Sequence, residues 1–279
     1  GHPERNPTIG IEVTTGPLGQ GIANAFGMAV AEAYLNARFG NDLVNHFTYA
    51  FVGDGCLQEG VGQEMISLAG HLKLGKLVLL WDDNQITDDG STALSISEDV
   101  AERFRVAGWH VVEVDGHDIE AVSAALDAAR ADPRPSMLAC RTVIAKGLAR
   151  LQGQRGGHSG RLFAEDAQAA RELLQWPHAP FEVPTDIQQA WHAASQRSQG
   201  EHAAWQTRVA ALPAADRAEF ERVMRGELPT HWQQVLLDYK QNALQAPPAP
   251  SGIFISAEIN DLLTPLLPER MVGCADLEA

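Results

Sequence analysis

Two side chains that carry oxygen, Asp54 and Asn84, are the strongest candidates for chemistry in this sequence. Each follows an apolar run typical of a buried strand: His46–Val52 precedes Asp54, and Lys76–Trp81 precedes Asn84. A hard divalent cation prefers oxygen ligands such as a carboxylate, an amide, a backbone carbonyl or a phosphate. The glycines beside Asp54 let the backbone approach a diphosphate. The pair therefore indicates a cation–diphosphate site, although Gly-Asp-Gly alone also fits a tight turn whose aspartate caps a helix.

The residues between these two runs, Gln58–Leu74, show the spacing of an amphipathic helix. The apolar positions that fall at i, i+3, i+4 and i+7 are Met65, Leu68, Ala69 and Leu72. A strand–helix–strand crossover is the unit of a parallel sheet. A right-handed crossover places Asp54 and Asn84 at the carboxyl edge of adjacent or near strands, where open α/β sheets bind ligands.

Strands and helices continue to alternate along the chain, which predicts an α/β fold: a doubly wound parallel sheet with helices on both faces, followed by a helical extension. Ser97 satisfies the N-cap rule for a helix start. The other expected elements are helices over 22–39, 119–130 and 253–267, and strands over 109–114, 136–144 and 271–277.

The bulk composition excludes several classes of protein. The chain has 279 residues, 45% of them hydrophobic, and a formal net charge of −15. Such an acidic chain is poorly suited to nucleic acid or an anionic membrane, and no apolar run is long enough to span a bilayer. Three cysteines in no paired spacing suggest a reducing, cytoplasmic location. Because the chain starts at Gly1 and not at methionine, we expect a fragment.

Two segments outside the crossover carry further polar candidates. Glu12–Gly21 is rich in glycine and leads into a helix, so its backbone amides could hold a phosphate, although small residues also serve close packing. Lys146–Phe163 has no periodicity and is predicted to be a mobile loop. It contains His158, and a lone loop histidine is ordinarily only solvated.

Three stretches in this order resemble the transketolase family: Gly1–Glu4, Thr14–Gly21, and Gly53–Gly60, the last followed one crossover later by Asp83-Asn84. The resemblance covers almost the whole chain. It implies a thiamine diphosphate-dependent transferase of the pentose phosphate pathway, which moves a two-carbon ketol unit from a ketose phosphate to an aldose phosphate. The cofactor supplies the carbanion chemistry, and the protein supplies binding and electrostatics.

The resemblance implies a role for each residue at the cofactor end of the site. The side chains of Asp54 and Asn84 and the carbonyl of Ile86 would ligate Mg²⁺ or Ca²⁺, and the cation would bridge to the diphosphate. Gly55 would contact the diphosphate through its backbone. Further backbone contacts to the cofactor are expected from Gly16, Pro17 and Leu18.

The resemblance also implies roles at the substrate end. His158 and His2 would bind the donor sugar's hydroxyls and help to move protons, and His158 would also contact the cofactor. Glu59 resembles a glutamate of a carboxylate relay between the two active sites of a dimer, but a helix start also favours an acid. After His158 the chain departs from the Gly-Ala-Pro-Leu-Gly of many members, which leaves the sugars open. Arg155 and Arg161 either meet a sugar phosphate or offset acidic neighbours.

Four regions are expected: a cofactor- and metal-binding α/β domain (1–183), a helical extension packing on it (184–245), a linker (246–252), and the start of a truncated pyrimidine-binding domain (253–279). Three tryptophans are expected to anchor the extension: Trp191, Trp205 and Trp232. In the family, the cofactor lies between this α/β domain and the pyrimidine domain of the second subunit of a homodimer. The chain alone is therefore expected to bind metal–diphosphate weakly and to turn over no sugar.

Two alternatives remain at this point. One is another thiamine enzyme, such as a deoxyxylulose-phosphate synthase, a phosphoketolase or a 2-oxo acid dehydrogenase. The other is a non-catalytic assembly subunit that kept the fold and lost the reaction. The presence of Asp54, Asn84 and His158 argues against such decay.

Overall fold

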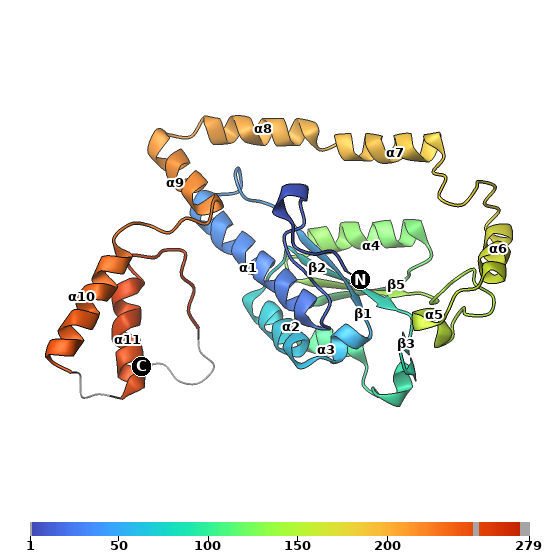
Figure 1. The fold of residues 1–279 in the computed structure, drawn as a ribbon, viewed down its shortest axis with the longest axis horizontal. Helices are drawn as coiled ribbons and strands as arrows, with labels where there is room; N and C mark the ends of the chain where they lie inside the picture. Colours follow the sequence, from blue (N-terminus) through green and yellow to red (C-terminus); the bar gives the residue numbers. More distant parts are fainter. Residues whose placement is uncertain (1, 248–250, 274–279) are drawn as a thin grey trace. The chain divides into compact units, whose positions relative to one another are not determined.

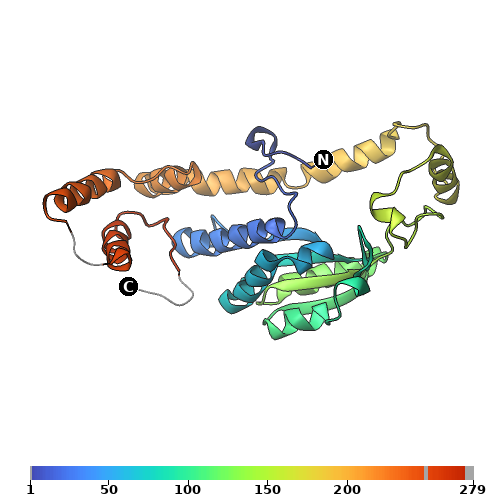
Figure 2. The same cartoon turned by 60° about the horizontal axis from the view of Figure 1, so that its bottom comes forward.

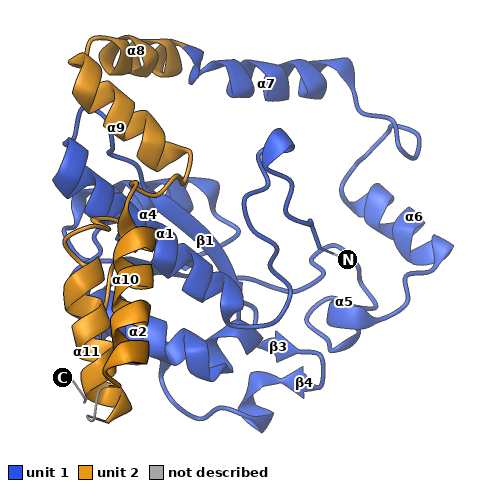
Figure 3. Ribbon diagram, turned by 60° about the vertical axis from the view of Figure 1, so that its left-hand side comes forward, with its two compact units in different colours: residues 1–199 blue, residues 200–279 orange. Residues whose placement is uncertain are grey.

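The structure, a computed structural model, describes residues 2–247 and 251–273. It divides into two compact units, residues 1–199 and 200–279 (Figure 3). The predicted domain boundaries remain a prediction. The predicted linker over 246–252 lies partly, and the predicted strand over 271–277 mostly, outside the described residues; Met271–Gly273 form no strand.

Unit 1 is built on a four-stranded parallel sheet in the order β1-β2-β6-β5 (Figure 1). The strands are β1 (Thr48–Gly53), β2 (Leu77–Asp83), β6 (Ser136–Arg141) and β5 (His110–Asp115). All three strand pairs are parallel. The predicted α/β class is confirmed.

Helices cover both faces of this sheet, as the alternation of side chains along a strand requires. Leu77, Leu79 and Trp81 of β2 face a core shared with α1 (Gln20–Phe39), α2 (Gly60–Leu72) and α3 (Val100–Val106). Val78 and Leu80 face the opposite core, which α4 (Ile119–Ala131) covers. Helices α1 and α2 lie side by side (Figures 1 and 2). The sheet is therefore doubly wound.

The helix predicted over Gln58–Leu74 begins differently from expectation. A 3₁₀ turn, η2 (Gly55–Gln58), precedes α2, and Glu59 between them is extended, with φ −81° and ψ 139°. Helix α3 starts after Asp99 rather than at Ser97, because the Asp99 carboxylate accepts the Glu102 N–H at 2.9 Å. Such shifts of a few residues leave the order of elements unchanged.

A small hairpin follows β2 at the carboxyl edge of the sheet. Strands β3 (Ile86–Thr87) and β4 (Gly90–Ser91) pair antiparallel around a turn at Asp88 and Asp89. Gln85, with φ 61°, turns the chain from the end of β2 into this hairpin. The remaining elements of unit 1 are η1 (Pro7–Ile9), η3 (Thr92–Leu94), α5 (Gly156–Ser159), α6 (Ala164–Leu173) and α7 (Thr185–Gln196).

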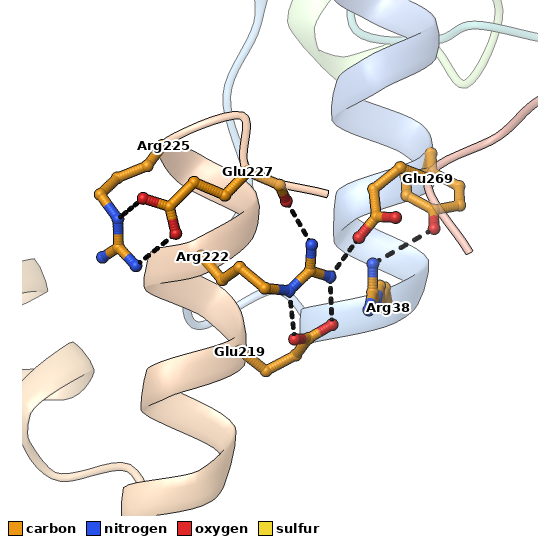
Figure 4. Close-up of polar contacts among 7 residues, drawn as sticks. Arg38, Glu219, Arg222, Arg225, Glu227 and Glu269 are labelled. Atoms are coloured by element: carbon orange, nitrogen blue, oxygen red, sulfur yellow. Dashed lines mark hydrogen bonds and ion pairs between the residues drawn. The ribbon is translucent and has the colours of Figure 1, made fainter. Parts of the chain in front are cut away.

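The second unit is helical. Its elements are α8 (Gln199–Ala210), α9 (Ala214–Met224), α10 (Trp232–Gln245) and α11 (Gly252–Leu263). Arg222 of α9 forms ion pairs with Glu219, at 2.7 Å, and with Glu269 (Figure 4). This pairing fastens the segment after α11 to α9.

Two further findings concern the surface. Trp191 of α7 is 73% exposed, so the prediction that it anchors its helix is wrong. Trp205 instead makes ring contacts within unit 2, with His202 and Phe220. No helix in the described part of the chain has the length and apolar character needed to cross a bilayer.

Candidate functional site

Asp54 and Asn84 follow neighbouring strands at the carboxyl edge of the sheet. Gly53, the last residue of β1, is in register with Asp82 of β2. Asp54 comes directly after Gly53, and Asn84 directly after the end of β2. The predicted placement of the two oxygen-bearing side chains at one edge of adjacent strands is confirmed.

The Asp54 carboxylate is buried, and one of its two oxygens has no hydrogen-bond partner. Its residue is 8% exposed, and its Oδ2 atom has no hydrogen-bond partner. Burial raises the pKa of Asp54 to about 6, and the nearby Asp83 carboxylate adds to the rise, whereas the Trp81 indole and the backbone of Gln85 oppose it. An unpaired buried carboxylate of this kind is suited to receive a cation.

The alternative that Asp54 merely caps the following turn is wrong. Asp54 occupies the N-cap position of η2, but its side chain makes no capping hydrogen bond. The carboxylate is therefore not used by the local backbone, which distinguishes it from Asp99 and Asp118, whose side chains do cap α3 and α4.

The amide of Asn84 is held at both of its ends. Its Nδ2 donates to Asp82 Oδ2 at 3.0 Å, and its Oδ1 accepts the backbone N–H of Ile86 at 2.9 Å. An amide oxygen has two lone pairs, so Oδ1 keeps one for a cation. Because Gln85 reverses the chain direction between them, Asn84 and Ile86 lie around the same turn.

The glycine-rich segment packs against the start of the crossover. A Cβ atom added to Gly55 would lie 3.1 Å from Leu18 Cδ1, and one added to Gly19 would lie 2.7 Å from Glu59 Cβ. A Cβ atom added to Gly16 would lie 2.6 Å from the His2 imidazole. A larger residue at any of these glycines would require the neighbouring side chain to shift. The structure thus brings together residues of all three motifs.

His158 lies against the hairpin that follows β2. Its Nδ1 is 3.4 Å from Asp88 Oδ1, and Ser159 donates to the same carboxylate. Arg155 Nε donates to the Asp88 carbonyl at 2.6 Å. Arg155 Nη2 also lies 3.6 Å from Asp89 Oδ1. The Arg161 guanidinium lies over Phe163, with its carbon 5.2 Å from the ring centre.

A cavity of about 460 Å³ opens beside Asp54 at the start of α3. Asp83 and Arg141 face it and form an ion pair at 3.0 Å. Burial raises the pKa of Asp83, while Arg141 lowers it. Asn84 and Ile86 do not line this cavity.

Protein side chains alone do not complete a metal centre in the described residues, where no group of three or more His, Cys, Asp or Glu side chains gathers. The donor set that the site offers is one carboxylate, one amide oxygen and backbone carbonyls. That set suits a hard cation whose remaining ligands come from phosphate and water. The unpartnered Oδ2 of Asp54 agrees with this fit.

Two further residues contribute contacts at this edge. The hydroxyl of Thr142, which follows β6, donates to Asp82 Oδ1. His117 accepts the backbone N–H of Val143 at 2.9 Å and so ties the ends of β5 and β6. Asp82 stood beside the recognised Asp83-Asn84 pair, but Thr142 lies 60 residues further on and carried no local signal.

Comparison with known proteins places these features in a family. The family model described as "Transketolase, thiamine diphosphate binding domain" matches residues 1–229. The transketolase of Cereibacter sphaeroides is 54% identical over 79% of this chain and 33% of its own length. Transketolase 2 of Vibrio parahaemolyticus is 46% identical over 99% of this chain and 43% of its own. The chain thus spans well under half of these relatives.

Solved structures show the same similarity. The transketolase of Leishmania mexicana aligns with a TM-score of 0.86 and 39% identity, over 99% of this chain and 42% of that one. A transketolase of Pichia stipitis in complex with sedoheptulose-7-phosphate aligns with a TM-score of 0.81 and 35% identity, over 92% of this chain and 39% of that one.

Proposed function

The chain belongs to the family of transketolase thiamine diphosphate-binding domains, and from that premise we propose that it holds the metal–diphosphate end of the cofactor in a ketol-transferring enzyme. The observation that carries the proposal is the buried Asp54 carboxylate at the carboxyl edge of the sheet, whose Oδ2 atom has no hydrogen-bond partner. The relatives compared above are all named transketolase, which favours this activity over that of other thiamine enzymes and over a non-catalytic subunit.

The cation would be held by Asp54, Asn84 and the carbonyl of Ile86, and its identity would be Mg²⁺ or Ca²⁺. Two features support this assignment: the free oxygen on Asp54 and the fixed amide of Asn84. Binding a cation would offset the unfavourable burial of the Asp54 charge. The cation's remaining ligands would be phosphate oxygens and water.

The diphosphate and the rest of the cofactor would lie against backbone rather than side chains. Gly55 would contact the diphosphate, and the segment of Gly16, Pro17 and Leu18 would line the cofactor. Support comes from the close packing of Leu18 on Gly55. When bound, thiamine diphosphate supplies the carbanion chemistry of two-carbon transfer. The chain's part is to bind, to orient and to exclude water.

His2 and His158 would contact the hydroxyls of a sugar phosphate donor and move protons near its carbonyl carbon. Support comes from the His2 imidazole, which lies close to Gly16, and from His158, whose Nδ1 is 3.4 Å from Asp88 Oδ1 in the hairpin after β2. Glu59, packed on Gly19, would join a carboxylate relay between the two active sites of a homodimer. A cytoplasmic location stays a prediction.

The decisive test is binding of Mg²⁺ and thiamine diphosphate by titration calorimetry. The Asp54→Ala variant should lose cation-dependent cofactor binding, because it removes the buried Oδ2 atom that has no hydrogen-bond partner. Asp127→Ala, which removes an exposed carboxylate of α4, is the matched control and should bind as the unmodified chain does. An unchanged affinity for thiamine diphosphate in Asp54→Ala would overturn the ligand assignment.

A further inference from the structure

The orientation of the Asn84 amide decides whether this residue attracts or repels a cation. If the amide were rotated by half a turn about its last bond, the NH₂ group would replace the oxygen. A positively polarised NH₂ group cannot ligate a cation. Something in the fold must therefore select one of two orientations that have nearly the same shape.

Asp82 makes that selection. Its carboxylate oxygen Oδ2 lies 3.0 Å from Asn84 Nδ2. An ionised carboxylate only accepts hydrogen bonds, so the group of Asn84 that faces it must be the NH₂. At the other end, the Ile86 N–H only donates, and it meets Asn84 Oδ1 at 2.9 Å. Rotating the amide would lose both hydrogen bonds and oppose oxygen to oxygen.

Thr142 in turn holds Asp82. Its hydroxyl donates to Asp82 Oδ1, the oxygen that Asn84 does not use. Its backbone N–H donates to the Asp83 carbonyl at 3.2 Å, which fixes Thr142 beside the end of β2. Its methyl group packs on Gly116: a Cβ atom there would lie 2.6 Å from Thr142 Cγ2. With the methyl side occupied by Gly116, the hydroxyl of this stiff, β-branched side chain points at Asp82.

The three contacts of Thr142, with Asp82, Asp83 and Gly116, connect the ends of β6, β2 and β5. From these contacts we propose that Asp82 and Thr142 are positioning residues of the cation site, which fix the Asn84 amide with its oxygen toward the cation. The inference rests on the proposed function, because it presupposes that Asn84 is a ligand. Neither residue touches the cation; each acts through Asn84.

Binding of Mg²⁺ in the presence of thiamine diphosphate tests the proposal. Asp82→Ala should raise the dissociation constant of Mg²⁺ by about 10- to 100-fold, the usual loss when a group that orients a metal ligand is removed. Thr142→Val, which keeps the shape but loses the hydroxyl, should raise it by less. Thr142→Ser keeps the hydroxyl and should restore binding, and Asp127→Ala should leave it unchanged.

A measurement without ligand separates positioning from general stability. The side-chain NH₂ resonances of Asn84, identified by their loss in Asn84→Asp, should move in Asp82→Ala and exchange faster with water. The midpoint of thermal unfolding, measured without cation, is the control. If Asp82 had only a structural role, Asp82→Ala would lower this midpoint and leave the dissociation constant of Mg²⁺ unchanged.

The outcomes distinguish the two proposals. Unchanged Mg²⁺ binding in Asp82→Ala, or unchanged Asn84 resonances, would overturn the positioning role and leave the proposed function intact. If the unmodified chain binds no Mg²⁺ with thiamine diphosphate, the proposed function fails instead, and the Asn84 resonances still decide whether Asp82 orients the amide.

Discussion

At the scale of the residue, the buried charge of Asp54 lowers stability, and this cost agrees with its proposed role as a cation ligand. Its carboxylate is buried beside Asp83 and Asp82, all three at the same sheet edge. The acid therefore has a raised pKa, and its ionised form is less favourable in the folded chain than in the unfolded one. A residue with no binding role would have little reason to keep this arrangement.

The pH dependence of stability follows from that shift. Because the folded-state pKa of Asp54, about 6, exceeds its ordinary value of 3.8, the folded chain binds the proton more tightly. Asp54 then favours folding most below the lower value, and this contribution is lost as pH rises through about 6. Asp54→Asn should gain stability relative to the unmodified chain between about pH 4 and 7. Urea unfolding of both proteins at several pH values measures this difference in stability. A difference that does not change with pH would contradict the raised pKa of Asp54.

Cation binding should show the opposite pH trend. Since the proton and the cation compete for the Asp54 carboxylate, the affinity for Mg²⁺ with thiamine diphosphate should fall as pH drops through about 6. Calorimetry across that range checks the prediction, with the cofactor held in excess. An affinity that is flat between about pH 5 and 7 would mean that Asp54 does not ligate the cation.

At the scale of the element, the position of α2 depends on one glycine. A Cβ atom added to Gly70 of α2 would lie 1.7 Å from the carbonyl oxygen of Ala107, which belongs to the turn after α3. The same contact area holds Trp109, whose indole N–H donates to the Ile66 carbonyl at 2.8 Å. Glu59 is the N-cap residue of α2. The packing of α2 against the turn after α3 therefore also positions Glu59.

Gly70→Ala should therefore destabilise the fold by about 1–3 kcal/mol or more, because backbone must move to admit the methyl group. Gly27 of α1 is the matched control: apart from the adjoining backbone of α1, no atom lies within 4 Å of its added Cβ. Gly27→Ala should stabilise by about 0.5–1 kcal/mol, since alanine favours the helix. Urea unfolding compares the two variants, and equal effects would contradict the close packing of α2.

At the scale of the whole molecule, the chain spans less than half the length of the curated transketolases compared above. It covers 33% and 43% of the lengths of two curated relatives. We expect the 279-residue chain alone to show no ketol transfer, because the proposed site needs the pyrimidine domain of a second subunit. Adding the remainder of the Vibrio parahaemolyticus relative as a separate polypeptide should restore turnover of a ketose phosphate. Transfer by the chain alone would refute this expectation.

The fold class and the positions of Asp54 and Asn84 at the sheet edge could be predicted from local patterns in the amino-acid sequence. Apolar runs of strand length before Asp54 and Asn84, and helical spacing between them, are local signals that hydrogen bonding and burial impose on any chain. Once a right-handed crossover joins two parallel strands, their carboxyl ends must share an edge. The order of the three motifs along the chain was then enough to identify the family.

The groups that surround Asp54 and Asn84 depend on the tertiary structure and could not be predicted from local sequence patterns. The order β1-β2-β6-β5 places β6, not the next strand in sequence, beside β2, and this alone brings Thr142 to Asp82. The same holds for His158 on Asp88 and for the burial that raises the pKa of Asp54. Contacts between residues far apart in sequence depend on strand order and on packing of the complete core, which local spacing does not specify.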